Sequence, residues 1–182
     1  LESRIFAYDM DEFGRRFASF DSAYSDFMGS EEDLLIFHYG LYCDNYRMYL
    51  ESRNRKVLIY HNIPPCEFYE GLYPEAVRLC RLGADILLQL KESDLALGVS
   101  EFNRRELVEA GFEEEKTGVL PINPTVDKLD AATEDRDFMR WLGGGTTNIL
   151  YVGRVVPNKK FEDVIKSFYC YHRGVNARSR MI

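Results

Sequence analysis

Cationic side chains gather at one short turn of this sequence, where an apolar run meets a helical pattern. Residues 151–160 read Tyr-Val-Gly-Arg-Val-Val-Pro-Asn-Lys-Lys. The planar guanidinium of Arg154 can hold a phosphate through paired hydrogen bonds, and Lys159 adds a mobile point charge. Gly153, Arg154 and Lys159 therefore form a candidate diphosphate-binding turn. The competing interpretation is an ordinary surface turn whose arginine and lysine only face solvent.

Two histidines close apolar runs elsewhere in the chain. His38 ends one run and His61 ends the next. Prolines at 64 and 65 stiffen the exit from the second run and hold the His61 imidazole at the edge of the predicted sheet. We therefore favour a ligand contact for His61. For His38 the sequence leaves a ligand contact and a structural hydrogen bond equally open, and His172, near a predicted helix end, is expected on the surface.

The elements that must position these residues alternate between strands and helices. A strand expected at 148–152 precedes a helix whose apolar positions Phe161, Val164 and Phe168 have helical spacing. Short apolar runs predict further strands at 34–38, 57–61, 95–99 and 118–121. This alternation predicts an α/β fold with a parallel sheet.

Helix boundaries are also marked in the sequence. Ser100 stands in the position of an N-cap, just after the run at 95–99. Residues 66–92 have a helical pattern with a break expected near 71–74, where Pro74 suits a first helical turn. These boundaries place the helices between successive strands.

The turn and the apolar runs together resemble glycosyltransferase family 4, a group of retaining enzymes with the GT-B fold. The resemblance is carried by Gly-Arg-x-x-Pro-x-Lys at 153–159, ahead of a Phe-x-x-Val-Ile-x-x-Phe helix. Four earlier segments stand in the same order as in the family, namely 33–40, 56–65, 94–107 and 118–122. With them the resemblance extends from about Asp33 to the chain end. It implies two Rossmann-like domains, of which this chain holds incomplete parts. One departure is Lys160, where the family usually has glycine.

The resemblance implies roles for individual residues. Gly153, Arg154 and Lys159 would bind the diphosphate of a nucleotide-sugar donor. His61 would approach the reacting sugar as a catalytic residue, and His38 and Asn62 are candidate contacts to the acceptor or the donor. The family's glutamate pair would lie beyond the last residue of this sequence.

Three segments are expected on the same basis. Residues 1–123 would belong to the N-terminal acceptor-binding domain, 124–147 to a linker with a helix around 134–142, and 148–182 to the start of the C-terminal nucleotide-sugar-binding domain. With 182 residues the chain is short for two complete domains, so we expect a fragment. The linker would act as a hinge, although its glycines at 143–145 are equally typical of a flexible surface loop.

Composition limits the classes of partner. A net charge of −7 argues against nucleic acid as the main ligand. The four cysteines lack C-x-x-C spacing, which favours reduced thiols and argues against a zinc site. The sequence has no signal peptide pattern and no apolar run long enough to cross a bilayer, so a cytoplasmic location is expected, with peripheral association at the inner face of the membrane as a candidate.

These observations favour a retaining glycosyltransferase that moves a sugar from a nucleoside-diphosphate sugar to a glycan, lipid or small-molecule acceptor, in a pathway such as polysaccharide biosynthesis. No cofactor or metal is expected, because the cationic turn can neutralise the leaving diphosphate. Two alternatives stay open: a non-catalytic nucleotide-sugar-binding module of a polysaccharide assembly, and a Rossmann oxidoreductase or epimerase. The last is disfavoured because no G-x-G-x-x-G opens a helix in this sequence.

Overall fold

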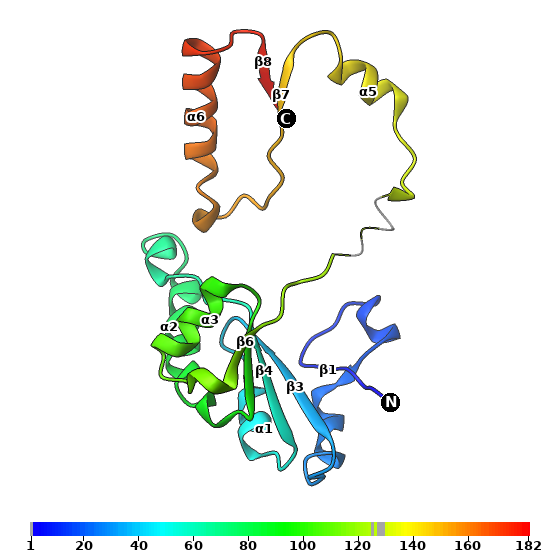
Figure 1. Ribbon diagram of the computed structural model, residues 1–182, viewed down its shortest axis with the longest axis vertical. Coiled ribbons are helices and arrows are strands. Elements are labelled where there is room, and N and C mark those ends of the chain that lie inside the picture. The colour runs from blue at the N-terminus through cyan, green and yellow to red at the C-terminus, as the bar shows by residue number, and fades with distance from the viewer. Residues whose placement is uncertain (1, 125, 127–129) are drawn as a thin grey trace. The chain divides into compact units, whose positions relative to one another are not determined.

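The computed structural model describes residues 2–124, 126 and 130–182 (Figure 1). The chain divides into two compact units, Leu1–Ile122 and Asn123–Ile182. Positions 125 and 127–129 of the predicted linker lie outside the described residues. The assignment of these units to an acceptor domain, a linker and a donor domain stays a prediction.

The first unit is built on a parallel four-stranded sheet. Its strands lie in the order β3-β4-β5-β6, which is also their order along the chain, and all neighbours are parallel. Their bounds are β3 Leu34–Tyr39, β4 Arg55–Tyr60, β5 Leu95–Gly98 and β6 Thr117–Val119. The four predicted strands and their parallel arrangement are therefore confirmed. The predicted α/β class holds, and an antiparallel sandwich is excluded for this unit.

Helices connect successive strands of this sheet, as parallel pairing requires. The α-helices of the unit are α1 Tyr46–Glu51, α2 Pro74–Leu87 and α3 Glu101–Glu109. The 3-10 helices are η1 Gly14–Arg16, η2 Asp21–Asp26, η3 Cys66–Tyr69, η4 Leu90–Glu92 and η5 Glu114–Lys116. Two short strands near the N-terminus, β1 Phe6–Ala7 and β2 Ser19–Phe20, form a separate parallel pair.

The segment between β4 and β5 differs in detail from the sequence prediction. The expected break is present, since Gly71 adopts a left-handed backbone with φ of +75° and α2 begins at Pro74. The predicted helix up to residue 92 is wrong at its end, because α2 stops at Leu87. A tighter turn follows, in which the Gln89 N–H donates to Ile86 O at 2.8 Å. This turn directs Leu90 into the core, where its side chain is fully buried.

The core of the first unit combines leucines with buried tyrosines. Leu58, Leu90 and Leu107 have no exposed surface. Two buried tyrosines add directional bonds: Tyr39 Oη donates to Gly83 O at 2.7 Å, and Tyr49 Oη lies 2.7 Å from Ser93 Oγ. Burial of a phenol hydroxyl without a hydrogen-bond partner would cost free energy, and these two bonds avoid that cost. Burial also raises the pKa of Tyr49 to about 12.

The second unit contains one strand-helix-strand crossover. Its elements are α5 Arg136–Leu142, β7 Thr147–Ile149, η6 Pro157–Lys159, α6 Phe161–Gly174 and β8 Ser179–Met181. β7 and β8 pair in parallel, and the pairing continues past the strands because Tyr151 N–H donates to Ile182 O at 2.9 Å. The predicted strand at 148–152 is therefore present but shorter.

This unit is open to solvent. Among its described residues Ser179 is the only buried one, and Leu150 and Val152 are 69% and 83% exposed. Arg180 joins α5 to β8, because its guanidinium lies 3.8 Å from the centre of the Trp141 ring and its Nε donates to Asn148 Oδ1 at 2.6 Å. Across the part of the chain that the structure describes, none of the helices has the length and apolar character needed to span a membrane.

A test of this packing is Gly98→Ala at the end of β5. A Cβ at this position would lie 2.4 Å from Arg104 N and 2.7 Å from Asn103 C, both backbone atoms of α3. The helix would have to move, and we expect a loss of about 1–3 kcal/mol in the free energy of unfolding. Urea unfolding followed by circular dichroism measures it.

The matched control is Gly29→Ala, because a Cβ at Gly29 meets no atom within 4 Å. Equal unfolding midpoints for Gly98→Ala and the unchanged protein would contradict the close approach of α3 to β5.

Candidate functional site

The two predicted histidines lie together at the carboxyl edge of the four-stranded sheet. His38 is the fifth residue of β3, and His61 directly follows β4. Their facing nitrogens, His38 Nδ1 and His61 Nε2, are 2.8 Å apart. Ligands of open α/β sheets bind outside the carboxyl ends of the strands, so this is the edge where a functional site is expected.

Backbone bonds fix the position of His61. Its N–H donates to Tyr39 O at 2.7 Å and so extends the β3-β4 ladder by one residue. Gly40 makes room for the side chain, because a Cβ at Gly40 would lie 3.1 Å from His61 Cβ. The imidazole itself is exposed. The sheet therefore presents His61 to solvent on a rigid backbone.

The electrostatic surroundings favour the neutral form of His61. Partial burial lowers its pKa, and the neighbouring His38 lowers it further. A neutral imidazole keeps one nitrogen as an acceptor and one as a donor, and the contact with His38 uses one of the two. The other nitrogen of His61 is available to a ligand.

Asn62 takes an unusual backbone conformation beside this pair. Its φ is +77°, in the left-handed region that asparagine tolerates better than most residues. Its side-chain amide donates to Glu106 Oε2 at 3.3 Å. Because the amide already has this partner, Asn62 acts first as a link between the end of β4 and α3, and its predicted ligand contact stays untested.

A polar network at the start of α3 was not predicted from the sequence beyond its first member. Ser100 is the N-cap, as expected, and its Oγ accepts from Asn103 N at 3.3 Å. Ser100 Oγ also donates to Asn103 Oδ1 at 2.7 Å, and Asn103 Nδ2 donates to Glu106 Oε2 at 3.1 Å. The signal that could have revealed it is the three-residue spacing of Ser100, Asn103 and Glu106, which places them on one helix face.

Glu106 is the charged member of this network. Burial raises its pKa, and the hydrogen bond from Asn103 opposes that shift only in part. One Glu106 oxygen accepts from both Asn62 and Asn103. The carboxyl group therefore holds the loop after β4 against α3.

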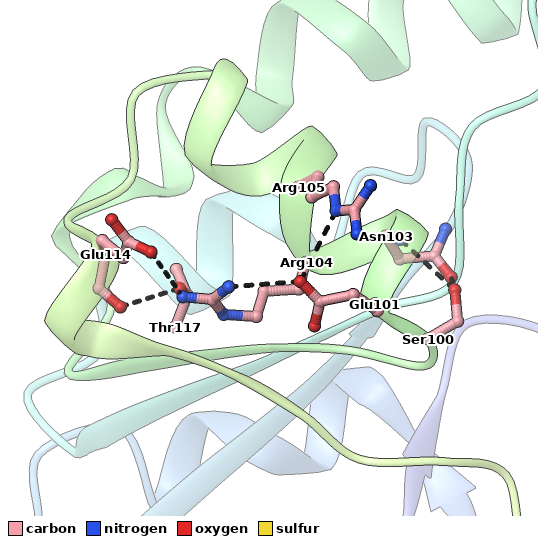
Figure 2. Close-up of polar contacts among 7 residues, drawn as sticks. All are labelled: Ser100, Glu101, Asn103, Arg104, Arg105, Glu114 and Thr117. Carbon is pink, nitrogen blue, oxygen red and sulfur yellow. Dashed lines mark hydrogen bonds and ion pairs between the residues drawn. The ribbon is translucent and has the colours of Figure 1, made fainter.

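Figure 2 shows the ion pairs on the adjoining face of α3. Arg104 lies between two carboxylates, with Nη1 at 3.3 Å from Glu101 Oε1 and Nη2 at 3.0 Å from Glu114 Oε1. Thr117 Oγ1 donates to Glu114 O at 2.8 Å, and Arg105 approaches Glu101 at 3.6 Å. These contacts tie α3 to the turn before β6. Their role is structural, since every charged group in them already has a partner.

The predicted diphosphate-binding turn lies in the second unit, between β7 and α6. Gly153, Arg154 and Lys159 are all exposed. Over the described ranges, neither the Arg154 guanidinium nor the Lys159 ammonium has a hydrogen-bond or ion-pair partner. Both cations are therefore available to an anion without breaking an existing contact.

Buried polar atoms accompany these cations. Tyr151 Oη and Asn158 Oδ1 are shielded from solvent and have no hydrogen-bond partner within the described part of the chain. The Tyr151 ring lies over Gly153, where a Cβ would be 2.9 Å from Tyr151 Oη, and its centre is 5.4 Å from that of Phe161. Polar groups without partners are uncommon in folded proteins and often mark sites that bind ligands.

Lys160, which departs from the family pattern, has a left-handed backbone with φ of +50°. It precedes α6 and occupies the position where the resembling family has glycine. The anion preference expected from the helix start is offset, because the first turn of α6 carries Glu162 and Asp163. An anion at this turn would therefore depend mainly on the side chains of Arg154 and Lys159.

His172 was expected on the surface, and this expectation is wrong in part. Its side chain is half-buried, and Nδ1 lies 3.1 Å from Ser179 O and 3.2 Å from Ser179 Oγ. It packs α6 against β8. Among the described residues, no group of three or more histidines, cysteines, aspartates or glutamates is arranged to hold a metal ion.

No protein-family model matches the chain, and a search of curated proteins finds no match.

The pH dependence of stability tests the role of Glu106. Because its pKa is raised in the folded protein, the folded state binds the proton more tightly than the unfolded chain. Stability therefore falls as the pH rises from the ordinary value of 4.5 through the folded pKa. Glu106→Gln removes this dependence, so the variant should gain stability relative to the unchanged protein between acid and neutral pH. Urea unfolding at a series of pH values measures the difference.

Glu106→Ala separates the charge from the hydrogen bonds. It leaves the amides of Asn62 and Asn103 without their acceptor and should lower the free energy of unfolding by about 1–3 kcal/mol. Glu67→Gln, at an exposed position, is the control. A pH profile of Glu106→Gln that parallels the unchanged protein would refute the proposed cost of ionisation.

Lys160→Gly tests the strained backbone before α6. Glycine adopts the left-handed conformation without the clash that a Cβ introduces, so the variant should be more stable by about 1 kcal/mol. Lys166→Gly is the matched control within α6 and should be less stable by about the same amount. Thermal unfolding followed by the fluorescence of Trp141 reports on this unit. A lower midpoint for Lys160→Gly would show that its side chain contributes more than its backbone costs.

Proposed function

We propose that this chain is part of a retaining glycosyltransferase of the GT-B type, which transfers a sugar from a nucleoside-diphosphate sugar to a glycan, lipid or small-molecule acceptor. The observation that carries the proposal is the turn after β7. There Arg154 and Lys159 are exposed and have no partner within the described residues, and Gly153 precedes them. Two cations held without counter-ions on a strand-turn-helix segment suit a doubly charged phosphate ligand.

The chemistry follows from where charge develops. When the bond between sugar and diphosphate breaks, the leaving diphosphate gains negative charge. Cationic groups placed at the phosphates then bind the transition state more tightly than the ground state and so lower the barrier. Arg154 and Lys159 take this role in the proposal. They supply the charge neutralisation that a metal ion supplies in other phosphate sites, so the reaction has no need of one.

His61 is the proposed catalytic residue. Its neutral imidazole can hydrogen-bond a sugar hydroxyl or a phosphate oxygen through the nitrogen not used by His38. The contact with His38 orients the ring, and the link from Asn62 to Glu106 fixes the loop that follows. His38 and Asn62 are therefore proposed as positioning residues that can also touch the acceptor or the donor.

The two units would divide the work. Residues 1–123 would contribute to acceptor binding, 124–147 would link the domains, and 148–182 would begin the donor-binding domain. The proposed setting is cytoplasmic, with a polysaccharide or lipid-linked acceptor at the inner face of the membrane.

Diphosphate binding tests the proposal directly. Each charge-assisted contact contributes roughly 1.5–3 kcal/mol, so Arg154→Ala and Lys159→Ala should each weaken binding of UDP or GDP about tenfold or more. Binding of uridine or guanosine should not change, because neither side chain has a reason to contact the base. Isothermal titration of the intact chain with each diphosphate and its nucleoside measures both.

Lys166→Ala is the matched control, since Lys166 is an exposed cation of α6 that pairs with Asp163 at 3.3 Å. It should bind UDP and GDP as the unchanged protein does. If all three variants lose the same affinity for UDP or GDP, the cause is the change in net charge and not a specific contact. That result would remove the basis of the proposal. Because this chain is expected to be an inactive fragment, sugar transfer from a panel of nucleotide-sugars is measured on the complete protein. It separates an enzyme from a binding module, because a module binds the diphosphate without turnover.

A further inference from the structure

The His38-His61 pair, which the proposed reaction uses to orient the His61 ring, also has a geometry that suits a second kind of ligand. Two imidazole nitrogens from adjacent parallel strands face each other at 2.8 Å, and both side chains are exposed. The strands that carry them are fixed in register, with His38 opposite Ile59 and the His61 N–H bonded to Tyr39 O. The two nitrogens are therefore held close together before any ligand binds.

This spacing suits two ligands of one metal ion. Imidazole binds zinc at about 2.0–2.1 Å, which puts two such nitrogens about 3.3 Å apart in a tetrahedral site and about 2.9 Å apart when the bonds meet at a right angle. The observed separation of 2.8 Å is close to the right-angle value and about 0.5 Å below the tetrahedral one. The ring centres are 5.1 Å apart, so the two nitrogens point at each other, and each ring must turn by about 35–45° to direct its lone pair at a shared metal ion. Both side chains are exposed, which leaves room for this turn.

We propose that His38 Nδ1 and His61 Nε2 form a two-imidazole binding site for late first-row divalent metal ions, namely Zn²⁺, Ni²⁺ and Cu²⁺. Imidazole favours these ions, whereas Mg²⁺ and Ca²⁺ favour oxygen ligands. Water completes the coordination, because the described residues offer no third histidine, cysteine or carboxylate in reach. The site is therefore open and exchanges its metal readily.

The proton balance is simple. Before binding, one of the two facing nitrogens carries the hydrogen that joins the pair. Metal binding moves that hydrogen to the other nitrogen of the same ring, so both facing nitrogens present lone pairs and no net proton is released. The His38-His61 hydrogen bond is replaced by two metal-nitrogen bonds.

A bound metal would occupy the His61 nitrogen that now faces His38 and would lock both rings. The proposed diphosphate contacts do not take part, since Arg154 and Lys159 carry no lone pair for a metal at neutral pH. The two inferences share His38 and His61, but metal binding is measured separately from diphosphate binding by Arg154 and Lys159, so either inference can fail without the other.

The test is titration of the intact chain with Zn²⁺ and with Ni²⁺, using a chromophoric chelator as competitor. We expect His38→Gln and His61→Gln each to weaken binding of both ions by at least about tenfold, because a single imidazole loses the chelate. His172→Gln is the matched control, since it removes the third histidine of the chain, which is bonded to Ser179. It should bind as the unchanged protein does. Mg²⁺ should not compete.

Paramagnetic broadening by Cu²⁺ gives a second readout that does not depend on affinity. In the imidazole spectrum of the ¹⁵N-labelled chain, the signals of His38 and His61 should broaden together while those of His172 stay sharp. Circular dichroism of each variant verifies that it folds. Binding that survives either His38→Gln or His61→Gln, or that falls equally with His172→Gln, would overturn the proposal.

Discussion

The parallel pairing of β4 between β3 and β5 is the constraint on which the first unit depends. Crossover connections cover both faces of a parallel sheet, and Leu58 and Ile59 of β4, which point to opposite faces, are both buried. Parallel pairing also places the carboxyl ends of all strands at one edge. As a result, the residues that follow β4 and β5 meet there although long crossovers separate them in sequence. The polar network from Asn62 to Ser100 exists because of this alignment.

Charge is distributed unevenly between the surface and the candidate site. The chain has a net charge of −7, yet the turn after β7 presents an arginine and a lysine without partners in the described residues. The surrounding negative charge opposes weakly held anions at long range, and salt reduces this opposition. Short-range contacts from Arg154 and Lys159 must therefore decide whether a phosphate binds. A ligand that reaches both cations gains from both contacts.

The sequence predicted the strands because local patterns determine them. Val57-Leu58-Ile59 is an apolar run with β-branched residues at both ends, which is typical of a buried strand. Ser100 has the hydrogen-bonding side chain that an N-cap requires. Local patterns do not determine which side chains meet across a crossover. The bond from Asn62 to Glu106 spans 44 residues, and its formation depends on the rotation of α3 about its axis. Lys160 is a different case, because its left-handed backbone contradicts the preference of a lysine and shows that the surrounding turn prevails over it.

The hydrogen bonds of the buried tyrosines limit the number of ways in which the core can pack. A leucine can rotate or shift and still exclude water, whereas the hydroxyl of Tyr39 has one acceptor, the carbonyl of Gly83 on α2. The hydroxyl of Tyr49 likewise meets Ser93 on the segment before β5. Alternative packings of α2 on the sheet would keep the apolar contacts but leave Tyr39 Oη unsatisfied, and a shift of the segment at Ser93 would do the same to Tyr49 Oη. Directional bonds in the interior thus select one register of helix on sheet from many that hydrophobic contact alone would accept.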